Sequence, residues 1–402
     1  MFRDIILVFS GLAVLIVGVL YPQEKNTIYG IPWTWFFIWY GMVLIISLRL
    51  INSSNLRIPS FFLLYFSLIF FIILSSATFI SDYKVDQFHF FDVFSVLILT
   101  TLTSYFLISG VRPDRFFYLA DKFCLTLCFF LLLFRLVEFD FSREGSFLGL
   151  GPLTFIKYVS LGVLIRLIYL KKFSLIAVFL YGSAYLISDS RGPLIYVFIV
   201  YSIYLVLSLR GFSIRNISFR NLSLGIVVFA LFISYAMNNA RLATSFQEIP
   251  LAFIDSSDLS VTDDDVAREE VSSIIVRLVA FSESIEILQE NPFFGIGPGQ
   301  WPNKTQMQSI DYPHNSLLEI WTEYGIFVLA IFLYLVWLVI KNILKGNVYG
   351  YLALFCFFTT LTSGGARDLR FFLLFALLTV FVSVFYKNTS KIKQGKRRIN
   401  FG

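Results

Sequence analysis

Long apolar blocks alternate with short polar segments along most of the chain. Each block is close to the roughly 20 residues that an α-helix needs to cross a bilayer. Their unbroken apolar character indicates helices and argues against a membrane β-barrel, whose strands alternate between apolar and polar residues. The pattern predicts twelve membrane helices, the first of them uncleaved rather than a signal peptide. The blocks lie near residues 5–21, 31–48, 61–80, 90–108, 117–137, 153–170, 173–188, 193–209, 223–238, 317–340, 347–363 and 370–386.

Composition strengthens this prediction. Of the 402 residues, 57% are hydrophobic, 14% are charged and 48 are Phe. Soluble domains are about half apolar and about one-quarter charged, so a soluble enzyme is excluded. We therefore expect an all-α fold, namely a polytopic membrane helix bundle of about 12 transmembrane helices with one large helical periplasmic loop.

Basic residues in the loops predict how the bundle crosses the membrane. They gather on alternate loops, and 19 of the 32 Lys and Arg residues fall on the side of the C-terminal segment. Because cytoplasmic loops are enriched in Lys and Arg, this side is predicted to be cytoplasmic, and both termini with it. The 19 residues are Arg3, Arg49, Arg57, Arg112, Arg115, Arg166, Lys171, Lys172, Arg210, Arg215, Arg220, Lys341, Lys345, Lys387, Lys391, Lys393, Lys396, Arg397 and Arg398.

One polar segment, residues 239–316, is much longer than the other loops. It contains twelve acidic and four basic residues, and a loop of this length in a compact protein is usually functional. It divides the chain into predicted helices one to nine (1–238), the periplasmic loop (239–316), helices ten to twelve (317–386) and a basic cytoplasmic tail (387–402).

An amphipathic helix is predicted inside this loop. It would begin at Asp263–Asp265, whose carboxylates suit the positive end of the helix dipole, and end before Asn291-Pro292. Apolar residues at three- and four-residue steps would form one face of this helix. They are Ile274, Leu278, Phe281, Ile285 and Leu288.

Two arginines on the predicted outer face could bind an anion. Arg191 lies where two spans meet almost without a loop; it could grip phosphate oxygens bidentately, reach the lipid headgroups or pair with Asp189. Arg277 lies among apolar neighbours in the acidic loop, where it could bind phosphate or pair with Glu270 or Glu283. The residues alone leave these alternatives open.

His314 is the sharpest candidate for chemistry, because it directly precedes the tenth predicted span and is one of only two histidines. A neutral imidazole there can serve as a general base or as a hydrogen-bond donor to phosphate. The alternative is a helix-capping role, for which Asn315 and Ser316 are better suited. The other histidine, His89, is interpreted as an anchor at the membrane interface.

Other motifs are less specific. The run Gly295–Gly299 is a turn whose backbone N–H groups could cradle an anion. Cys124, Cys128 and Cys356 lie in apolar blocks and are interpreted as core residues. Asp263–Asp265 is interpreted as a solvated helix start instead of a cation site. We predict no metal and no cofactor, and infer that an anionic, lipid-borne substrate is handled outside the cytoplasm without ATP.

Three motifs in order resemble the O-antigen ligase/polymerase family over roughly residues 180–335. They are Ser190-Arg191-Gly192, the stretch from Arg277 and Phe281 into Asn291-Pro292-Phe293-Phe294-Gly295-Ile296-Gly297, and Pro313-His314-Asn315 followed by Gly325. Two positions depart from the family pattern. Phe281 stands where the family often has Trp, and Val328 stands where ligases tend to have Gly, Thr or Tyr, which favours a polymerase.

The resemblance implies an inverting glycosyltransferase of the bacterial inner membrane that needs neither metal nor nucleotide. The donor would be an oligosaccharide on undecaprenyl pyrophosphate. An O-antigen polymerase would transfer it to an acceptor glycan lipid at the periplasmic face, whereas an O-antigen ligase would transfer it to lipid A–core. The expected partners are therefore these lipids, the bilayer and a protein that regulates chain length, with no nucleic acid.

The resemblance also assigns roles to residues of this chain. Arg191 and Arg277 would clamp the pyrophosphate and stabilise the charge that develops as it leaves, with Arg241 as a further ligand. His314 would orient or deprotonate the acceptor hydroxyl, or stabilise the phosphate. The expected substrate contacts beyond these are Asn315, Gly295 and Gly297.

Two other classes of protein fit the pattern of spans. A flippase for lipid-linked oligosaccharides would have a site near mid-membrane and internal repeats, but no repeat is evident and the polar candidates gather at the outer surface. A structural subunit would not require an arginine such as Arg191 at the membrane boundary. Both fit less well than a transferase.

The predicted topology can be tested by labelling. A tag at Ser256 should react with a membrane-impermeant reagent added to the periplasm, because the large loop is predicted to lie outside. A tag after Lys396 should react only in permeabilised cells. The opposite labelling pattern would discard the proposed location of the site.

Overall fold

The computed structural model describes most of the second half of the bundle and parts of the first. It covers residues 2–17, 27–28, 31–32, 41, 45, 101–107, 110–138, 152–172, 174–188, 192–209, 273–305, 313–363 and 369–380. Within these ranges the chain is helical apart from turns and one hairpin, formed by β1 (Thr27–Ile28) and β2 (Ile31–Pro32). The all-α prediction therefore holds for the described residues, with this hairpin as the exception.

The helices are α1 (Phe2–Val17), α5 (Pro113–Glu138), α6 (Pro152–Leu164), which continues as the π-helix η1 (Ile165–Leu170), α7 (Leu175–Ser188), α8 (Gly192–Leu209), α12 (Ser273–Glu290), α13 (Trp301–Lys304), α14 (Ser316–Leu344), α15 (Gly350–Ser363) and a last helix over Leu369–Val380. Apart from α12 and α13, which belong to the predicted large loop, these helices coincide with predicted spans. Within the described part, α5 and α14 are long and apolar enough to cross a membrane by length and composition. The predicted spans at 31–48, 61–80 and 223–238, and most of 90–108, lie outside the described residues, so the number of spans stays a prediction.

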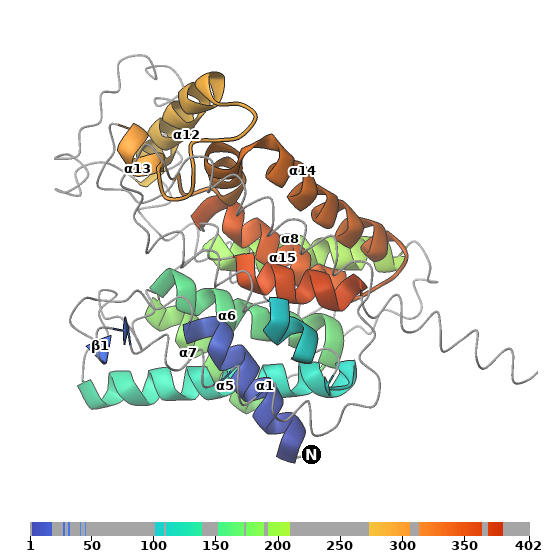
Figure 1. Cartoon of the computed structure of the whole chain (residues 1–402). Helices are drawn as coiled ribbons and strands as arrows, with labels where there is room; N and C mark the ends of the chain where they lie inside the picture. Colours follow the sequence, from blue (N-terminus) through green and yellow to red (C-terminus); the bar gives the residue numbers. More distant parts are fainter. Residues whose placement is uncertain are drawn as a thin grey trace, which may run out of the picture.

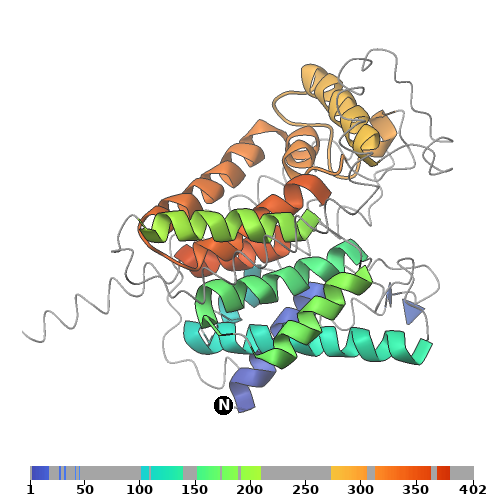
Figure 2. The ribbon, with the colours of Figure 1, turned by 180° about the vertical axis from the view of Figure 1, so that it is seen from behind.

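The helices pack in successive layers. In Figures 1 and 2, α14 lies along one side of the bundle, α8 and α15 lie next to it, α6 and α7 follow, and α5 with α1 forms the opposite side. The short helices α12 and α13 lie against the first part of α14. Segments far apart in the sequence therefore meet at one end of the bundle, where α14 begins.

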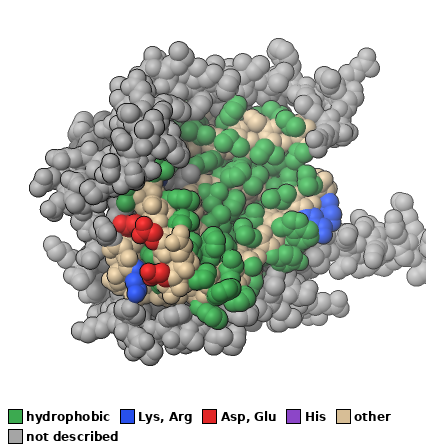
Figure 3. Space-filling model, turned by 90° about the horizontal axis from the view of Figure 1, so that it is seen from above, with side chains coloured by type: hydrophobic (Ala, Val, Ile, Leu, Met, Phe, Trp, Pro, Cys, Tyr) green, Lys and Arg blue, Asp and Glu red, His purple; other side chains and the backbone are tan. Residues whose placement is uncertain are grey.

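Aromatic side chains fill the space between these layers. Phe332 of α14 lies 5.2 Å from Phe372 of the last helix, measured between ring centroids, and Phe117 of α5 stacks on Tyr349 at 5.0 Å. Large apolar side chains also point outward along α14, where Trp337 is about half exposed. Figure 3 shows hydrophobic side chains over most of the described surface on that face, with charged side chains at its margins. Such a surface is typical of helices that face lipid.

Charged and hydroxyl groups from the predicted cytoplasmic loops meet at one end of the bundle. Arg115 pairs with Asp4 of α1 at 2.6 Å. The hydroxyl of Tyr169 donates to Asp114 at 2.8 Å and lies 3.1 Å from the hydroxyl of Tyr349. These segments are widely separated in sequence, and the alternation of basic loops predicts that they share one side. The side of the membrane that this end faces stays a prediction.

A buried ion pair links α5 to η1. Arg166 donates from Nε and Nη2 to the two carboxylate oxygens of Asp121, at 2.6 and 2.7 Å, and Tyr181 of α7 donates to the same carboxylate at 2.9 Å. Arg166 was counted with the loop cations although it falls within the predicted span 153–170; its side chain is 7% exposed inside the bundle, so it does not lie in a loop. A bidentate contact with Asp121 offsets the cost of burying the guanidinium.

Replacing Asp121 with Asn should strongly destabilise the protein. The substitution keeps the side-chain shape but leaves Arg166 charged and buried, which costs about 3–5 kcal/mol. Thermal unfolding of the purified protein in detergent should show a lower midpoint than the wild type. Asp114→Asn is the matched control, because Asp114 is exposed, and its midpoint should change little. Equal midpoints for the two variants would contradict a stabilising role for the buried pair.

Candidate functional site

The amphipathic helix of the large loop is present as α12, and its buried face matches the predicted one only in part: Leu288 is buried as predicted, but other residues of the predicted face are not. Ala280, Ser284 and Ile287 are buried, whereas Phe281 is 50% exposed. The reason is Trp301 of α13, whose fully buried indole donates from Nε1 to the Ser284 hydroxyl oxygen at 3.0 Å. Small side chains on α12 make room for this large ring. The end of α12 at Glu290 agrees with the helix stop predicted at Asn291-Pro292.

The helix that follows His314 is broken at Gly325. Gly325 has φ 81° and ψ 175°, so α14 consists of an outer part that ends at Tyr324 and a longer part that begins at Ile326. Such a break frees backbone groups that a continuous helix would satisfy internally. In a membrane they need other partners, since lipid offers none.

The glycine-rich turn after α12 provides these partners. The amides of Ile296 and Gly297 donate to the carbonyls of Thr322 and Glu323, at 2.8 and 3.0 Å. In return the amide of Ile326 donates to the Phe293 carbonyl at 3.1 Å. The turn therefore completes the backbone hydrogen bonding of α14 at its break.

Two glycines make this close approach feasible. A Cβ on Gly325 would lie 2.1 Å from the Phe293 carbonyl oxygen, and one on Gly295 would lie 2.7 Å from the Thr322 carbonyl oxygen. Both glycines also have positive φ, which other residues rarely adopt. The amide of Gly297 donates to α14, so it does not point into an anion cradle. The structure thus supports a packing role for Gly295 and Gly297, while their contact with substrate stays a prediction.

The backbone at the start of α14 holds His314 in an unusual conformation. His314 has φ 52°, in the left-handed region, and is half-buried. Asn315 directly after it caps α14, because its side-chain oxygen accepts from the amides of Leu317 and Leu318 at 3.0 and 3.3 Å. His and Asn adopt the left-handed region more readily than most residues, and strained conformations concentrate at functional sites.

The other predicted site residues are described in part. Arg277 is half-buried on α12, the helix that packs on the outer part of α14. α12, the glycine-rich turn and the start of α14 therefore lie together at one end of the bundle (Figure 1). Arg191 and Arg241 lie outside the described residues, as do His89 and Asp263–Asp265.

Two buried acids close to this region were not among the predicted residues. Glu319 and Glu323 lie on the outer part of α14, one turn apart, and are 2% and 0% exposed. Their spacing of four residues in an otherwise apolar segment is the signal that could have indicated them.

The cysteines contribute to the core, as predicted. All three are free thiols, and all are buried. Cys124 and Cys128 lie in one cluster on the same side of α5. Across the ranges described by the structure, no three His, Cys, Asp or Glu side chains gather as a metal site would require.

A Cβ at Gly325 should be far more damaging than one at another glycine of the same conformation. Gly325→Ala should lower the free energy of unfolding by about 3 kcal/mol or more, because the added methyl displaces backbone. The control is Gly346→Ala, where φ is 84° but nothing lies within 4 Å; it should cost about 1–2 kcal/mol from the backbone conformation alone. Thermal unfolding in detergent measures the difference, and equal losses would argue against the close packing.

Comparison with known proteins gives a family match for part of the chain. No curated protein matches the chain, but residues 176–333 match the sequence model of a family described as O-antigen ligase. The matched segment contains every predicted site residue, from Arg191 to Asn315, together with the break at Gly325. The resemblance seen in the motifs is confirmed over this segment: residues 176–333 are similar to the O-antigen ligase family.

Proposed function

We propose that this protein is an O-antigen polymerase, or a polymerase of a related surface polysaccharide. It transfers a glycan from undecaprenyl pyrophosphate to the sugar of an acceptor lipid at the periplasmic face of the bacterial inner membrane. The family match over residues 176–333 carries this proposal, because it spans all the predicted site residues. The packing of α12 and the glycine-rich turn on the outer part of α14 supports it.

The proposed reaction is a single inverting displacement. The acceptor hydroxyl oxygen attacks the anomeric carbon of the donor sugar and forms the new glycosidic bond. The bond from that carbon to the pyrophosphate oxygen breaks, and undecaprenyl pyrophosphate leaves with the electron pair. The acceptor proton passes to the imidazole of His314, which acts as the general base.

Arginines compensate the charge that develops on the leaving group. A guanidinium binds two phosphate oxygens in one plane and stays protonated, so it stabilises the transition state without a proton transfer of its own. In the proposal, Arg277 and Arg191 take this role, and Arg241 is a further ligand. Neither a metal ion nor a nucleotide takes part.

The helix cap supports the position proposed for His314. Asn315 fixes the first turn of α14 through two backbone amides, and the turn docked at Gly325 fixes the far end of that outer segment. The imidazole is thereby carried on a short segment held at both ends. A base held in this way needs little reorganisation as the acceptor hydroxyl reacts.

An O-antigen ligase is the second candidate, favoured by the description of the matching family. It would use the same donor and the same residues but transfer the finished glycan to lipid A–core. The residue at position 328 favours the polymerase, because ligases tend to have Gly, Thr or Tyr where this chain has Val. Val328 is 3% exposed against the core.

Replacing His314 tests the function and separates the two candidates. In a host whose only copy carries His314→Ala, the lipopolysaccharide gel should show core with a single repeat unit if polymerisation is lost and ligation persists. Bare core with polymer retained on the lipid carrier would identify a ligase instead. Loss of a general base costs about 10²–10⁴-fold in rate, so either pattern should be pronounced.

Two control variants sharpen this experiment. His314→Gln keeps a hydrogen-bond donor but removes the base, so it should fail like His314→Ala. His89→Ala removes the other histidine and should leave the gel pattern unchanged. Normal long-chain glycan from a stably expressed His314→Ala variant would contradict both candidate functions.

A further inference from the structure

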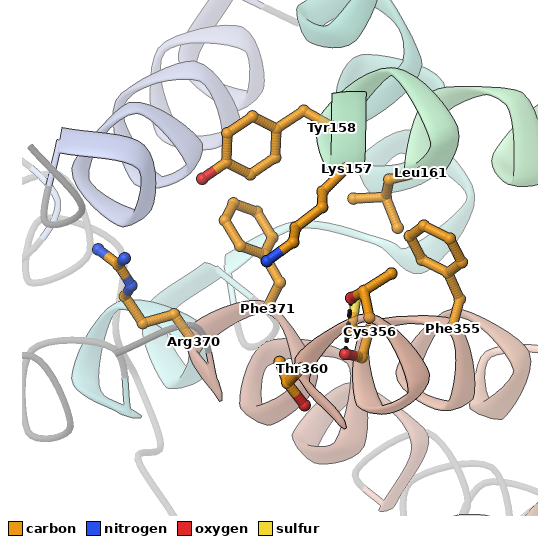
Figure 4. Close-up of a pocket in the computed structure, with 9 residues that line it drawn as sticks. Lys157, Tyr158, Leu161, Phe355, Cys356, Thr360, Arg370 and Phe371 are labelled. Carbon is orange, nitrogen blue, oxygen red and sulfur yellow. Dashed lines mark hydrogen bonds between the residues drawn. The ribbon is translucent and has the colours of Figure 1, made fainter. Parts of the chain in front are cut away.

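The seam between α6, α15 and the last helix is closely packed. Its free space holds about one water molecule, which is too little for a lipid headgroup or a sugar. Figure 4 shows Lys157 reaching from α6 toward α15, whereas Arg370 on the last helix is directed away from Lys157. The outer surface of the bundle therefore says more than this seam about what the protein contacts.

Exposed apolar side chains follow one face of the longer part of α14. They recur at three- and four-residue steps and so form a single stripe. Its members are Ile326, Phe327, Ala330, Leu333, Tyr334, Trp337 and Ile340. Beyond them Lys341 lies with its ammonium 4.4 Å from the centroid of the Trp337 ring. Tryptophan and snorkelling lysine are typical of the headgroup level, so this pair marks the far end of the stripe.

The stripe is shorter than the apolar thickness of a bilayer. At about 1.5 Å per residue, residues 326–340 cover about 22 Å, roughly 8 Å less than a hydrocarbon core of about 30 Å. Any tilt of α14 shortens the covered height further. The hydrocarbon therefore continues past Gly325, where the glycine-rich turn docks on α14.

Two aromatic side chains of that turn extend the stripe beyond the break. Phe293 and Phe294 are each 60% exposed. The ring of Phe294 lies 6.0 Å from that of Phe327, the second residue of the longer part of α14, measured between centroids. Single exposed apolar residues are common on protein surfaces, but a contiguous apolar patch marks a contact surface.

The chemistry of the segment around this turn suits an apolar medium. The large loop contains twelve acidic and four basic residues, yet none of them falls in residues 291–303. A bilayer core excludes charged side chains far more strongly than neutral ones. An uncharged stretch with two adjacent phenylalanines is therefore the part of the loop that can enter it.

Backbone groups of the turn already have partners in the protein. The carbonyl of Pro292 accepts from Nε1 of Trp321 at 3.2 Å, and that of Phe293 accepts from the amide of Ile326 at 3.1 Å. The amides of Ile296 and Gly297 donate to α14, as described above. Irregular backbone is tolerated at membrane depth where protein groups satisfy it in this way.

We propose that the turn at residues 291–299 inserts into the bilayer, where Phe293 and Phe294 contact lipid acyl chains. The leaflet is the one at the end where α14 begins, which is predicted to be the outer one. Lipid is the partner because the two rings continue the stripe of α14 at a depth that the hydrocarbon core still covers. The insertion anchors the second half of the large loop and holds α12 at the membrane surface. This inference does not depend on the proposed transfer reaction.

A nitroxide label on the turn tests the proposal. Phe294→Cys is labelled and reconstituted into vesicles of phosphatidylethanolamine and phosphatidylglycerol. Power-saturation EPR then compares collisions of the label with oxygen, which concentrates in hydrocarbon, and with a water-soluble nickel chelate. The ratio of oxygen to nickel collisions should be several-fold higher at position 294 than at an aqueous reference. The native cysteines are buried, so the unsubstituted protein should take up little label and supplies the background.

Two further labelled positions provide the references. Leu333→Cys reports on the exposed stripe of α14, and Glu286→Cys reports on an exposed charged position of α12. Position 294 should resemble position 333. A ratio equal to that at position 286 would place the turn in water and overturn the proposal. Shielding from both reagents would show that protein covers the ring, from a second copy or another chain, and would overturn it too.

A second variant keeps the experiment decisive if the first does not fold. Phe294 contacts Phe327, so its replacement could disturb the turn. Phe293→Cys then takes its place, because this side chain is equally exposed and its backbone carbonyl can still accept from Ile326. The same two references apply, and a label at position 293 that the nickel chelate reaches as readily as position 286 would contradict insertion.

Discussion

The backbone hydrogen bonds at Gly325 are the constraint on which the site depends. A helix broken within a membrane protein exposes carbonyls that lipid cannot satisfy. Here Thr322 and Glu323 receive amides from the turn at 293–297, and the exchange is reciprocal through Ile326. Since this turn directly follows α12, sealing the break also fixes where α12 lies. One set of backbone contacts thus places Arg277 and His314 at the same end of the bundle.

Polar groups are divided between the two ends of the bundle according to what they contact. At one end, charges and hydroxyls satisfy each other, as Asp4 does with Arg115 and Tyr169 with Asp114. At the end where α14 begins, the glycine-rich turn and the Asn315 cap satisfy backbone groups of α14. The first arrangement stabilises the fold. The second holds in place the segment that carries His314.

The sequence was sufficient where the determining interactions are local. Apolar block length set the positions of the helices, and Asn291-Pro292 set the end of α12. It failed where the partner is distant. Arg166 was counted with the loop cations, whereas it pairs inside the bundle with Asp121, which lies 45 residues earlier in the chain. The buried face of α12 was misassigned in part, because Trp301 of α13 packs against Ser284 while Phe281 stays half exposed.

The docking of the glycine-rich turn shows most clearly why spacing alone was not enough. A glycine-rich turn can bind an anion or pack closely against another backbone segment. Both uses require an amide that is free to donate and a position without a Cβ. The amide of Gly297 is committed to α14, and Gly295 has the Thr322 carbonyl where a side chain would stand. In the proposed transferase the glycines therefore contribute by keeping the segment that carries His314 in place, while their contact with substrate stays a prediction.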